Sequence, residues 1–315
     1  MPALNIIFMG TAELSCASLS ALLADTRWRV VAVVTQPDKP KGRNLAAHAS
    51  PVKVLALSVG VPVLQPARAR DESFLAELRL FQPDLIVVVA YGQILPQSLL
   101  DLPRYGCLNV HTSLLPRYRG AAPIQWAIAN GEPETGVTIM KMDAGLDTGP
   151  VLTQERTPIT PLDDAATLHE RLARLGAGLL GQTIPTYVEG KITPQPQPTE
   201  GVTYAARIKK EDGRILWHQP AAQIWNRLRA FTPWPGAFTQ HSSATGHLLL
   251  KIWRAAVVAR SGPNGEILSA DRDGLIVGCG QDALQITELQ REGGRRLTAR
   301  DFLAGHPLRP GDKFG

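Results

Sequence analysis

The sequence predicts two domains: an α/β domain with a doubly wound, mostly parallel, Rossmann-like sheet, and after it a small antiparallel β-barrel that is OB-like. Three observations lead to this prediction. The chain has 315 residues, which is enough for two domains. Short apolar runs alternate with helical patterns over the first 190 residues, as in βαβ units. A proline-rich stretch then separates this part from a series of short β-like runs.

The N-terminal part alternates strands with helices. Residues 30–34 are rich in β-branched side chains, and residues 86–89 are apolar throughout, as in a strand buried on both faces. Apolar side chains at helical spacing over residues 72–81 predict a helix. By the same reasoning we expect strands at residues 5–9, 29–35, 61–64, 84–90, 107–110 and 135–140, and helices at residues 15–23, 51–59, 72–81, 123–129 and 164–188.

The C-terminal part begins after a run that contains Pro194, Pro196 and Pro198. These prolines exclude a helix and leave few donors for a sheet, so we interpret residues 190–206 as a stiff linker. We therefore expect residues 1–189 to form the N-terminal α/β domain and residues 207–315 to form the OB-like domain. In that domain we expect short strands, separated by glycine-containing turns, at residues 248–253, 256–259, 266–269, 275–277 and 283–289.

The composition is that of an ordinary globular chain, 44% hydrophobic and 19% charged. No apolar run approaches the roughly 20 residues needed to span a membrane, and the N-terminus carries no basic region typical of a signal peptide. The three cysteines lie far apart and form no metal-binding spacing. We therefore expect a cytoplasmic protein that contacts no membrane and uses no metal.

The positive charge is concentrated at one end of the chain. Residues 1–200 hold 17 Lys+Arg and 18 Asp+Glu, a net charge of −1, whereas residues 201–315 hold 16 and 10, a net charge of +6. This asymmetry favours contact between the C-terminal part and a polyanion such as nucleic acid. Small surface domains also carry such a surplus without binding one, so the charge alone does not decide the partner.

Polar or glycine residues follow two neighbouring predicted strands. Ala90, Tyr91 and Gly92 end the first of them, and Asn109 and His111 end the next. In open parallel sheets, ligands bind beyond the carboxyl ends of the strands. Asn109 and His111 are two residues apart, so in an extended chain they point to the same side. An amide and an imidazole aimed at one point can stabilise a developing oxyanion; alternatively, the pair only caps a turn.

A second polar cluster lies at residues 142–150. Its two glycines and two aspartates indicate a loop that folds sharply and presents its backbone to a ligand. A carboxylate of this loop that faced His111 would stabilise the protonated imidazole. Asp143 and Asp147 are equally good candidates for that carboxylate, and either can be a turn residue only.

These residues belong to a long and chemically unusual string: Asn109-x-His111-x-Ser113-Leu114-Leu115-Pro116-x-x-x-Gly120, with Asp147 36 residues after His111. The string resembles the 10-formyltetrahydrofolate-dependent formyltransferases. The resemblance covers essentially the whole chain and is strongest for the members that act on methionyl initiator tRNA. Further matching stretches lie at residues 36–43, 50–53, 120–125, 134–140 and 229–236.

The resemblance implies a reaction and the residues that perform it. Residue by residue, Asn109, His111 and Asp147 match the catalytic trio of the family. The donor is 10-formyltetrahydrofolate, no metal takes part, and a monomeric enzyme formylates the α-amine of methionyl initiator tRNA for translation initiation. Ser113, Leu114, Leu115 and Pro116 match the segment that contacts folate in the family. We expect the folate also to contact the end of the preceding predicted strand, at Ala90, Tyr91 and Gly92.

On the acceptor side, the family inserts the loop at residues 36–53 into the tRNA acceptor stem. Here the loop carries Lys39, Lys41, Arg43 and Lys53, and we expect Arg43 to be the key contact. The glycine and lysine pair that usually follow are replaced by residues 44–48, Asn-Leu-Ala-Ala-His. Fewer cations predict fewer phosphate contacts and a weaker salt dependence.

The C-terminal part supplies a second set of cations. Lys209 is the one we select as a tRNA contact. Trp225, Phe231 and Trp234 could stack on bases, but core packing is the favoured interpretation for them. Further candidates for phosphate contact are Lys210, Arg227, Arg229, Lys251, Arg254, Arg295, Arg296 and Arg300.

Four other functions remain open. A nucleotide-sugar amine formyltransferase shares the trio and a C-terminal barrel, but the basic second domain and the Ala121-Ala122-Pro123 run favour tRNA. A glycinamide ribonucleotide transformylase lacks the long extra domain. A silent tRNA-binding module would not need the intact trio. A folate hydrolase would not need a basic barrel.

Overall fold

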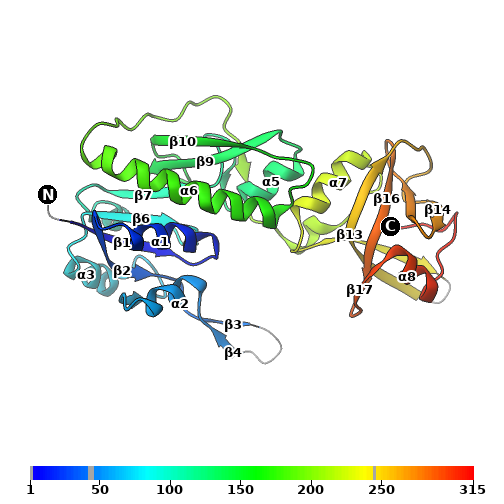
Figure 1. Ribbon diagram of the computed structural model, residues 1–315, viewed down its shortest axis with the longest axis horizontal. Helices are drawn as coiled ribbons and strands as arrows, with labels where there is room; N and C mark the ends of the chain where they lie inside the picture. Colours follow the sequence, from blue (N-terminus) through cyan, green and yellow to red (C-terminus); the bar gives the residue numbers. More distant parts are fainter. Residues whose placement is uncertain (1–2, 42–45, 244–245) are drawn as a thin grey trace. The chain divides into compact units, whose positions relative to one another are not determined.

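The computed structural model describes residues 3–41, 46–243 and 246–315, and the chain folds into two compact units (Figure 1). The N-terminal unit comprises Met1–Pro123, Glu134–Pro158 and His169–Ala205. The C-terminal unit comprises Ile124–Pro133, Ile159–Leu168 and Ala206–Gly315. No helix among the described residues is long and apolar enough to cross a membrane.

The N-terminal unit is built on a mixed seven-stranded sheet in the order β10-β9-β7-β6-β1-β2-β5. The five strands from β7 to β5 run parallel, β9 runs antiparallel to β7, and β10 antiparallel to β9. The predicted mostly parallel sheet is therefore confirmed, with an antiparallel pair added at one edge. The strands are β1 (Leu4–Gly10), β2 (Trp28–Val34), β5 (Val63–Leu64), β6 (Leu85–Val89), β7 (Cys107–His111), β9 (Glu134–Lys141) and β10 (Val151–Pro158).

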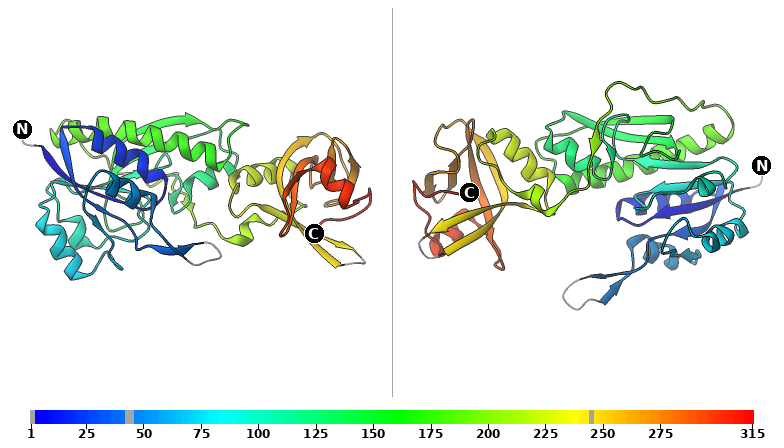
Figure 2. Two further views of the ribbon diagram at one scale, coloured as in Figure 1. Left: turned by 60° about the horizontal axis from the view of Figure 1, so that its bottom comes forward. Right: turned by 180° about the vertical axis from the view of Figure 1, so that it is seen from behind.

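Helices cover both faces of this sheet (Figures 1 and 2). On one face lie α1 (Leu14–Ala24) and α6 (Ala165–Val188), and Gly176 of α6 packs closely against Val110 and Val137 of the strands below. On the other face, α3 (Glu72–Leu80) and α4 (Gln97–Leu100) form a core with alternate residues of β1 and β6. The two-sided cover explains why these strands are apolar on both faces.

The strand order reverses direction at β1, which lies between β2 and β6. In such sheets the carboxyl ends of the strands beside the reversal form the ligand-binding edge. Here the carboxyl ends of β1 and β6 are held together, because Ser15 Oγ donates to Val89 O (2.6 Å) and Thr11 Oγ1 to Tyr91 O (3.0 Å). The fold thus places the predicted site residues at this edge.

The C-terminal unit contains an antiparallel sheet in the order β12-β13-β16-β15-β14, with β17 paired to β16. The two runs predicted at residues 248–253 and 256–259 form a single strand with irregular register near Arg254. The elements are α7 (Ala221–Ala230), β12 (Ala237–Ser243), β13 (Gly246–Val258), β14 (Ile267–Asp271), β15 (Gly274–Gly278), β16 (Ala283–Arg291), β17 (Arg296–Thr298) and α8 (Ala299–Gly305), joined by α5 (Pro123–Ala129) from earlier in the chain.

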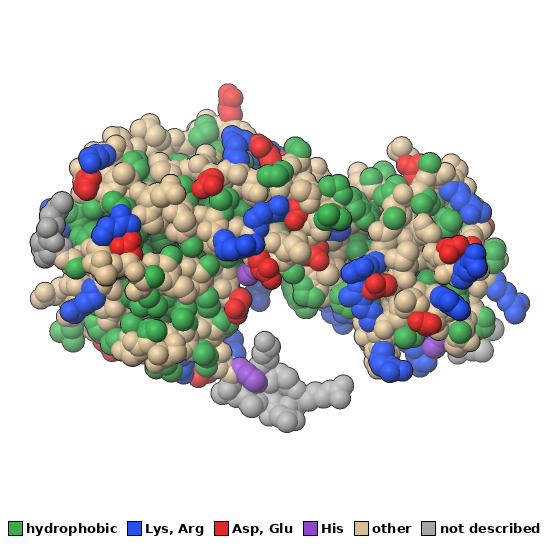
Figure 3. Space-filling view, in the orientation of Figure 1, with side chains coloured by type: hydrophobic (Ala, Val, Ile, Leu, Met, Phe, Trp, Pro, Cys, Tyr) green, Lys and Arg blue, Asp and Glu red, His purple; other side chains and the backbone are tan. Residues whose placement is uncertain are grey.

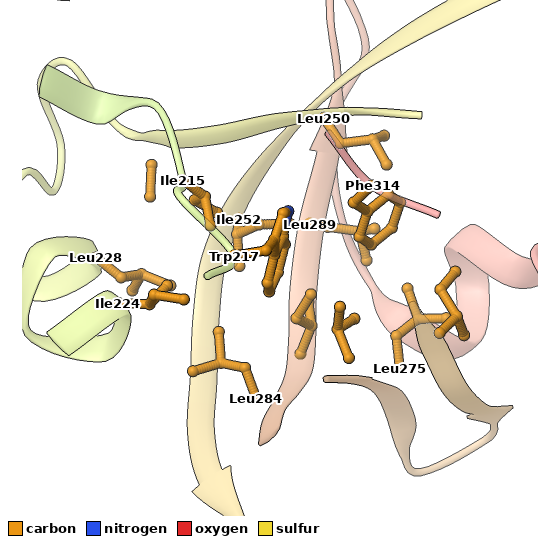
Figure 4. Packing of buried hydrophobic residues seen from close by; sticks show 14 of the residues in the cluster. Ile215, Trp217, Ile224, Leu228, Leu250, Ile252, Leu275, Leu284, Leu289 and Phe314 are labelled. Atoms are coloured by element: carbon orange, nitrogen blue, oxygen red, sulfur yellow. The ribbon is translucent and has the colours of Figure 1, made fainter. Parts of the chain in front are cut away.

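The core of the C-terminal unit lies between this sheet and its helices (Figure 4). Trp217 stacks on Phe314 with 5.8 Å between the ring centroids, and its indole donates to Thr239 Oγ1 (3.0 Å). The same C-terminal segment pairs with both edges of the sheet: Gly315 exchanges backbone hydrogen bonds with Gln240, and Phe314 N donates to Gly265 O (2.8 Å). The segment therefore satisfies backbone groups that edge strands would otherwise expose.

The proline-rich residues 190–205 lie in the N-terminal unit. Gln195 exchanges two 2.8 Å backbone hydrogen bonds with Val151. Further along, β11 (Tyr204–Ala205) pairs in parallel with β8 (Arg119–Gly120). The segment that we interpreted as a linker is thus bonded at two places, Gln195 and β11, to the unit that carries the predicted trio.

Phe231 and Trp234, which lie in the same stretch at residues 229–236, have opposite environments. Phe231 is fully buried, 6.0 Å from Trp126 in an edge-to-face pair, whereas Trp234 is 59% exposed. Core packing is thus confirmed for Phe231 and wrong for Trp234. We expect Phe231→Ala to lower the free energy of unfolding by about 3–5 kcal/mol, and Trp234→Ala to change it by less than about 0.5 kcal/mol. Chemical denaturation measures both, and equal losses would contradict this assignment.

Candidate active site

Asn109 and His111 end strand β7 at the ligand-binding edge of the sheet. Both are buried, with 8% and 6% of their surface exposed. Their strand is fixed from both sides, since Asn109 is in register with Val88 of β6 and with Met140 of β9. The two side chains therefore point to the same side of the strand, as their two-residue spacing predicts, and both lie beside the same carboxylate.

That carboxylate is Asp147, from the loop between β9 and β10. Its Oδ1 accepts from Asn109 Nδ2 at 3.3 Å, and its Oδ2 lies 3.8 Å from His111 Nδ1. Gly120 N donates to the same Oδ2 at 2.8 Å and holds it in place. The structure thus brings the three predicted residues together, although they are spread over 39 positions of the sequence, counting from 109 to 147.

The structure separates the two aspartates that the sequence left equivalent. Asp143 is exposed, and its Oδ1 accepts from Gly145 N (3.1 Å) and Thr148 Oγ1 (2.7 Å). It folds the loop in which it lies. Asp147 instead has a left-handed backbone (φ 52°) that turns its side chain to His111. Aspartate tolerates this conformation better than most residues.

The tautomer of His111 follows from its second contact. His111 Nε2 lies 2.9 Å from the carbonyl oxygen of Tyr118, which can only accept, so Nε2 carries a proton. Nδ1 is then the nitrogen that faces Asp147. The 3.8 Å separation is an ion-pair distance and too long for a hydrogen bond. A protonated Nδ1 would be stabilised by the carboxylate while still able to donate to a substrate oxygen.

The predicted folate segment after β7 is folded by its own polar groups. Ser113 is fully buried, and its Oγ donates to Arg117 O at 2.6 Å. Leu115 N donates to Thr138 Oγ1 (3.1 Å), and Gln154 Nε2 donates to Leu115 O (2.8 Å). Sequence reasoning did not identify Thr138 and Gln154 as partners of this segment, because they come from other strands, β9 and β10, and meet it only in the folded sheet. These polar groups are bonded within the protein, whereas the apolar Leu114 and Pro116 are half-buried and keep surface that a ligand can reach.

The second predicted folate segment, at the end of β6, presents its backbone. Ala90 and Gly92 are exposed and have positive φ angles, 45° and 85°. Tyr91 between them is 2% exposed, and burial raises the pKa of its hydroxyl to about 12. The Tyr91 carbonyl accepts from Gln36 Nε2 at 2.9 Å. The tyrosine side chain thus anchors the turn, and the backbone on either side of it is accessible to a ligand.

Cys107 lies at the start of β7 and is also buried. Burial raises the pKa of its thiol to about 12, so it carries no thiolate at neutral pH. A nucleophile needs the thiolate form. This agrees with the interpretation of Cys107 as a structural residue. Among the residues that the structure describes, no group of three or more His, Cys, Asp or Glu side chains is placed to hold a metal ion.

The basic loop before α2 (Pro51–Ser58) contains a short hairpin, β3 (Lys39–Lys41) and β4 (Ala46–His48). Lys39 is exposed, and its Nζ donates to Gln36 Oε1 at 2.7 Å. Lys41 ends β3, and Arg43, the predicted key contact, lies outside the described residues. Lys53 pairs with Asp38 at 2.7 Å and lowers the pKa of that carboxyl, so it fixes the base of the loop.

The cations of the C-terminal unit fall into two groups. Lys209 is exposed and precedes a 3₁₀ turn, η1 (Lys210–Gly213), and other Lys and Arg side chains lie at the surface of this unit (Figure 3). Arg227 and Arg229 are instead used within the unit. Arg227 donates to Asp212 O (2.8 Å), and Arg229 donates to Thr160 O and Asp163 O (2.9 Å each). Burial lowers the pKa of both guanidinium groups, which stabilise loops rather than face a phosphate.

Comparison with known proteins gives one consistent family. The family described as "Formyl transferase" matches residues 4–184, and "Formyl transferase, C-terminal domain" matches residues 207–307. A methionyl-tRNA formyltransferase of Myxococcus xanthus is 53% identical over 311 residues, 98% of this chain and 97% of the relative. One of Geobacter metallireducens is 51% identical over the full length of both chains.

The fold also matches a solved structure of an N-formyltransferase. The N-formyltransferase from Helicobacter canadensis, in complex with folinic acid and dTDP-3-aminofucose, is 18% identical with a TM-score of 0.65. The match covers 90% of this chain and 98% of the other. At this identity the likeness extends to the fold alone.

Proposed function

The chain belongs to the formyl transferase family, and we propose that it transfers the formyl group of 10-formyltetrahydrofolate to the α-amino group of methionyl initiator tRNA. The observation that carries this proposal is the meeting of Asn109, His111 and Asp147 at the carboxyl end of β7. An amide, an imidazole and a carboxylate around one point provide two oxyanion donors and one proton acceptor. Groups of these kinds accelerate acyl transfer to an amine.

The acceptor is inferred from the extent of the similarity. Relatives named methionyl-tRNA formyltransferase are about half identical over the full chain, and their similarity includes the C-terminal residues with a net charge of +6. The N-formyltransferase solved in complex with dTDP-3-aminofucose is only 18% identical. A tRNA acceptor also accounts for a positively charged second unit, because phosphate contacts supply much of the affinity for nucleic acid.

The described residues suit a folate as the donor. A flat heterocycle needs an apolar wall and backbone groups for its polar edge. Leu114 and Pro116 offer apolar surface after β7, and the exposed turn at Ala90 and Gly92 offers backbone at the end of β6, the neighbouring strand. We propose that these four positions contact the folate directly, and that Ser113, Leu115 and Tyr91 keep the two segments in shape. When bound, 10-formyltetrahydrofolate supplies the activated formyl carbon.

The trio then performs the transfer in defined roles. Asn109 Nδ2 and His111 Nδ1 donate to the formyl oxygen as the neutral α-amine attacks and charge builds on that oxygen. Asp147 stabilises the charged imidazole and, directly or through a water molecule, accepts the proton that the amine loses. This proton passes to the departing folate nitrogen, so the trio ends the reaction as it began. Holding both substrates in register contributes the rest of the rate.

We assign tRNA binding to both units. Lys39 on the hairpin β3–β4 and Lys209 before η1 are exposed, which supports their contact with phosphates. Lys41 and Arg43 are proposed as further contacts from their place in the sequence. We interpret residues 1–189 as the catalytic domain and residues 207–315 as the tRNA-binding domain. The C-terminal sheet, whose two edges both pair with residues 312–315, is proposed to be an OB-like barrel. A monomer in the cytoplasm, where initiator tRNA is used, fits this function.

The proposal is tested by formyl transfer from labelled 10-formyltetrahydrofolate. Methionyl initiator tRNA, uncharged initiator tRNA and an amino-sugar nucleotide are offered to the protein in parallel. We expect label on the methionyl ester alone. Label on the sugar alone would keep the trio in its roles but overturn the acceptor, and label on neither would contradict the proposed reaction.

A further inference from the structure

The environment of Asp147 depends on a side chain far along the sequence. Gln197, in the proline-rich segment, uses all four hydrogen-bonding positions of its amide. Its Nε2 donates to the carbonyl oxygens of Asp147 and Gly149, at 2.8 Å each. Its Oε1 accepts from Arg119 Nε (3.1 Å) and Nη2 (2.7 Å), and Arg119 is itself buried. One amide thus fastens the Asp147 loop to the chain that follows β7.

The loop leaves the common backbone conformations at the residue that enters the site. Asp147 has a φ of 52°, a left-handed conformation that few non-glycine residues adopt and that aspartate tolerates better than most. At Gly149 a side chain would have its Cβ 1.9 Å from Lys141 O, so the chain passes that carbonyl without room to shift. Gln197 binds the carbonyl of each of these two residues. It therefore holds the loop at the residue whose carboxylate enters the site.

The same segment also positions the other side of the carboxylate. Gly120, whose N–H holds Asp147 Oδ2, pairs with Ala205 in the β8–β11 ladder. A side chain at Gly120 would have its Cβ 2.8 Å from Ala205 O, and its φ is 114°, so the two strands meet too closely for any other residue. The proline-rich segment therefore fixes Asp147 in two ways. Gln197 binds its backbone carbonyl, and Ala205 positions Gly120, whose N–H binds its carboxylate.

His111 is connected to this segment as well. Its Nε2 donates to Tyr118 O, and Tyr118 N donates to Thr203 Oγ1 at 2.8 Å. Arg119 N donates to Thr203 O at 2.9 Å. Residues 197–205 thus help to hold two members of the trio, Asp147 and His111.

We propose that Gln197 is a positioning residue of formyl transfer: its amide fixes the Asp147 loop so that the carboxylate meets Asn109 and His111. The inference rests on the proposed function. It assigns a catalytic purpose to a segment whose sequence suggests only a spacer. This role requires an amide rather than a carboxylate at position 197, because only the amide nitrogen can donate to the two carbonyl oxygens.

The test compares Gln197→Glu and Gln197→Ala with the parent protein. Gln197→Glu keeps an acceptor for Arg119 but places a carboxylate oxygen against two carbonyls. We expect its kcat for methionyl initiator tRNA to fall by roughly 10–100-fold, as for a misplaced catalytic group. Both KM values should stay within about threefold, and the melting temperature within about 3 °C of the parent. Gln197→Ala should show the same split between kcat and KM.

Gln195→Glu is the matched control. Gln195 lies two residues earlier in the same segment, is exposed, and its Nε2 donates to Thr193 O within the segment. We expect parent-like kcat for this variant. A Gln197→Glu variant with parent-like kcat would overturn the inference, as would a loss shared with Gln195→Glu or accompanied by equal rises in KM. No transfer by the parent itself would instead count against the proposed function.

Discussion

Replacing Asp147 by asparagine should lower kcat by roughly 10²–10⁴-fold, the range typical of a lost acid–base group. The substitution removes the proton acceptor and the charge that stabilises protonated His111. It also disturbs the hydrogen bonds, since both carboxylate oxygens of Asp147 now accept, one from Asn109 Nδ2 and the other from Gly120 N. In either orientation of the new amide, its NH₂ group would face another donor.

The measurement is the steady-state kcat for formylation of methionyl initiator tRNA at saturating concentrations of both substrates. Asp143→Asn is the matched control, because Asp143 lies in the same loop and is engaged in its turn. We expect that variant to stay within a few-fold of the parent. Equal losses in the two variants would show that the loop, rather than the Asp147 carboxylate, was being tested.

The second large effect is expected for Asn109→Ala, at roughly 10²–10³-fold in kcat, the usual cost of one oxyanion donor. Asn109 is 8% exposed and its amide donates to Asp147. In the proposed mechanism this amide acts mainly on charge that develops in the transition state. KM for both substrates should therefore change little.

Asn5→Ala serves as the control for this substitution. Asn5 lies near the amino end of β1, at the opposite edge of the same sheet, and its Nδ2 donates to Gln82 O. Steady-state kinetics of both variants provide the comparison. An Asn109→Ala variant whose kcat stays within a few-fold of the parent would remove this residue from the proposed mechanism.

The parts of the fold that sequence predicted are those with a strong local signal. Strands β2 and β6 are apolar runs, and α3 has helical apolar spacing, so each was found within one or two residues of its bounds. Asn109 and His111 were paired correctly because their positions follow from strand geometry. The choice of Asp147 over Asp143 needed the family resemblance, and the structure supports that choice through contacts between distant residues.

The parts that were missed depend on pairing partners that sequence does not reveal. Strand β10 lies at the edge of the sheet. Its polar residues Thr153 to Arg156 are half-buried and exposed in turn, so it has no apolar run to predict a strand. Helix α7 was missed although Ile224 and Leu228 face the core at helical spacing, because two arginines and a short length weaken its pattern. Gln197 gave no signal, since its role comes entirely from the carbonyls it meets.

That Asn109, His111 and Asp147 act as one unit is tested most directly by the double variant Asn109→Ala/Asp147→Asn. Its single-turnover formylation rate is compared with those of the two single variants. Groups that serve one transition state lose their effects together, so we expect the double variant to be about as slow as the slower single variant. A double variant whose loss equals the product of the two single losses would contradict a shared role and show that the two residues act independently.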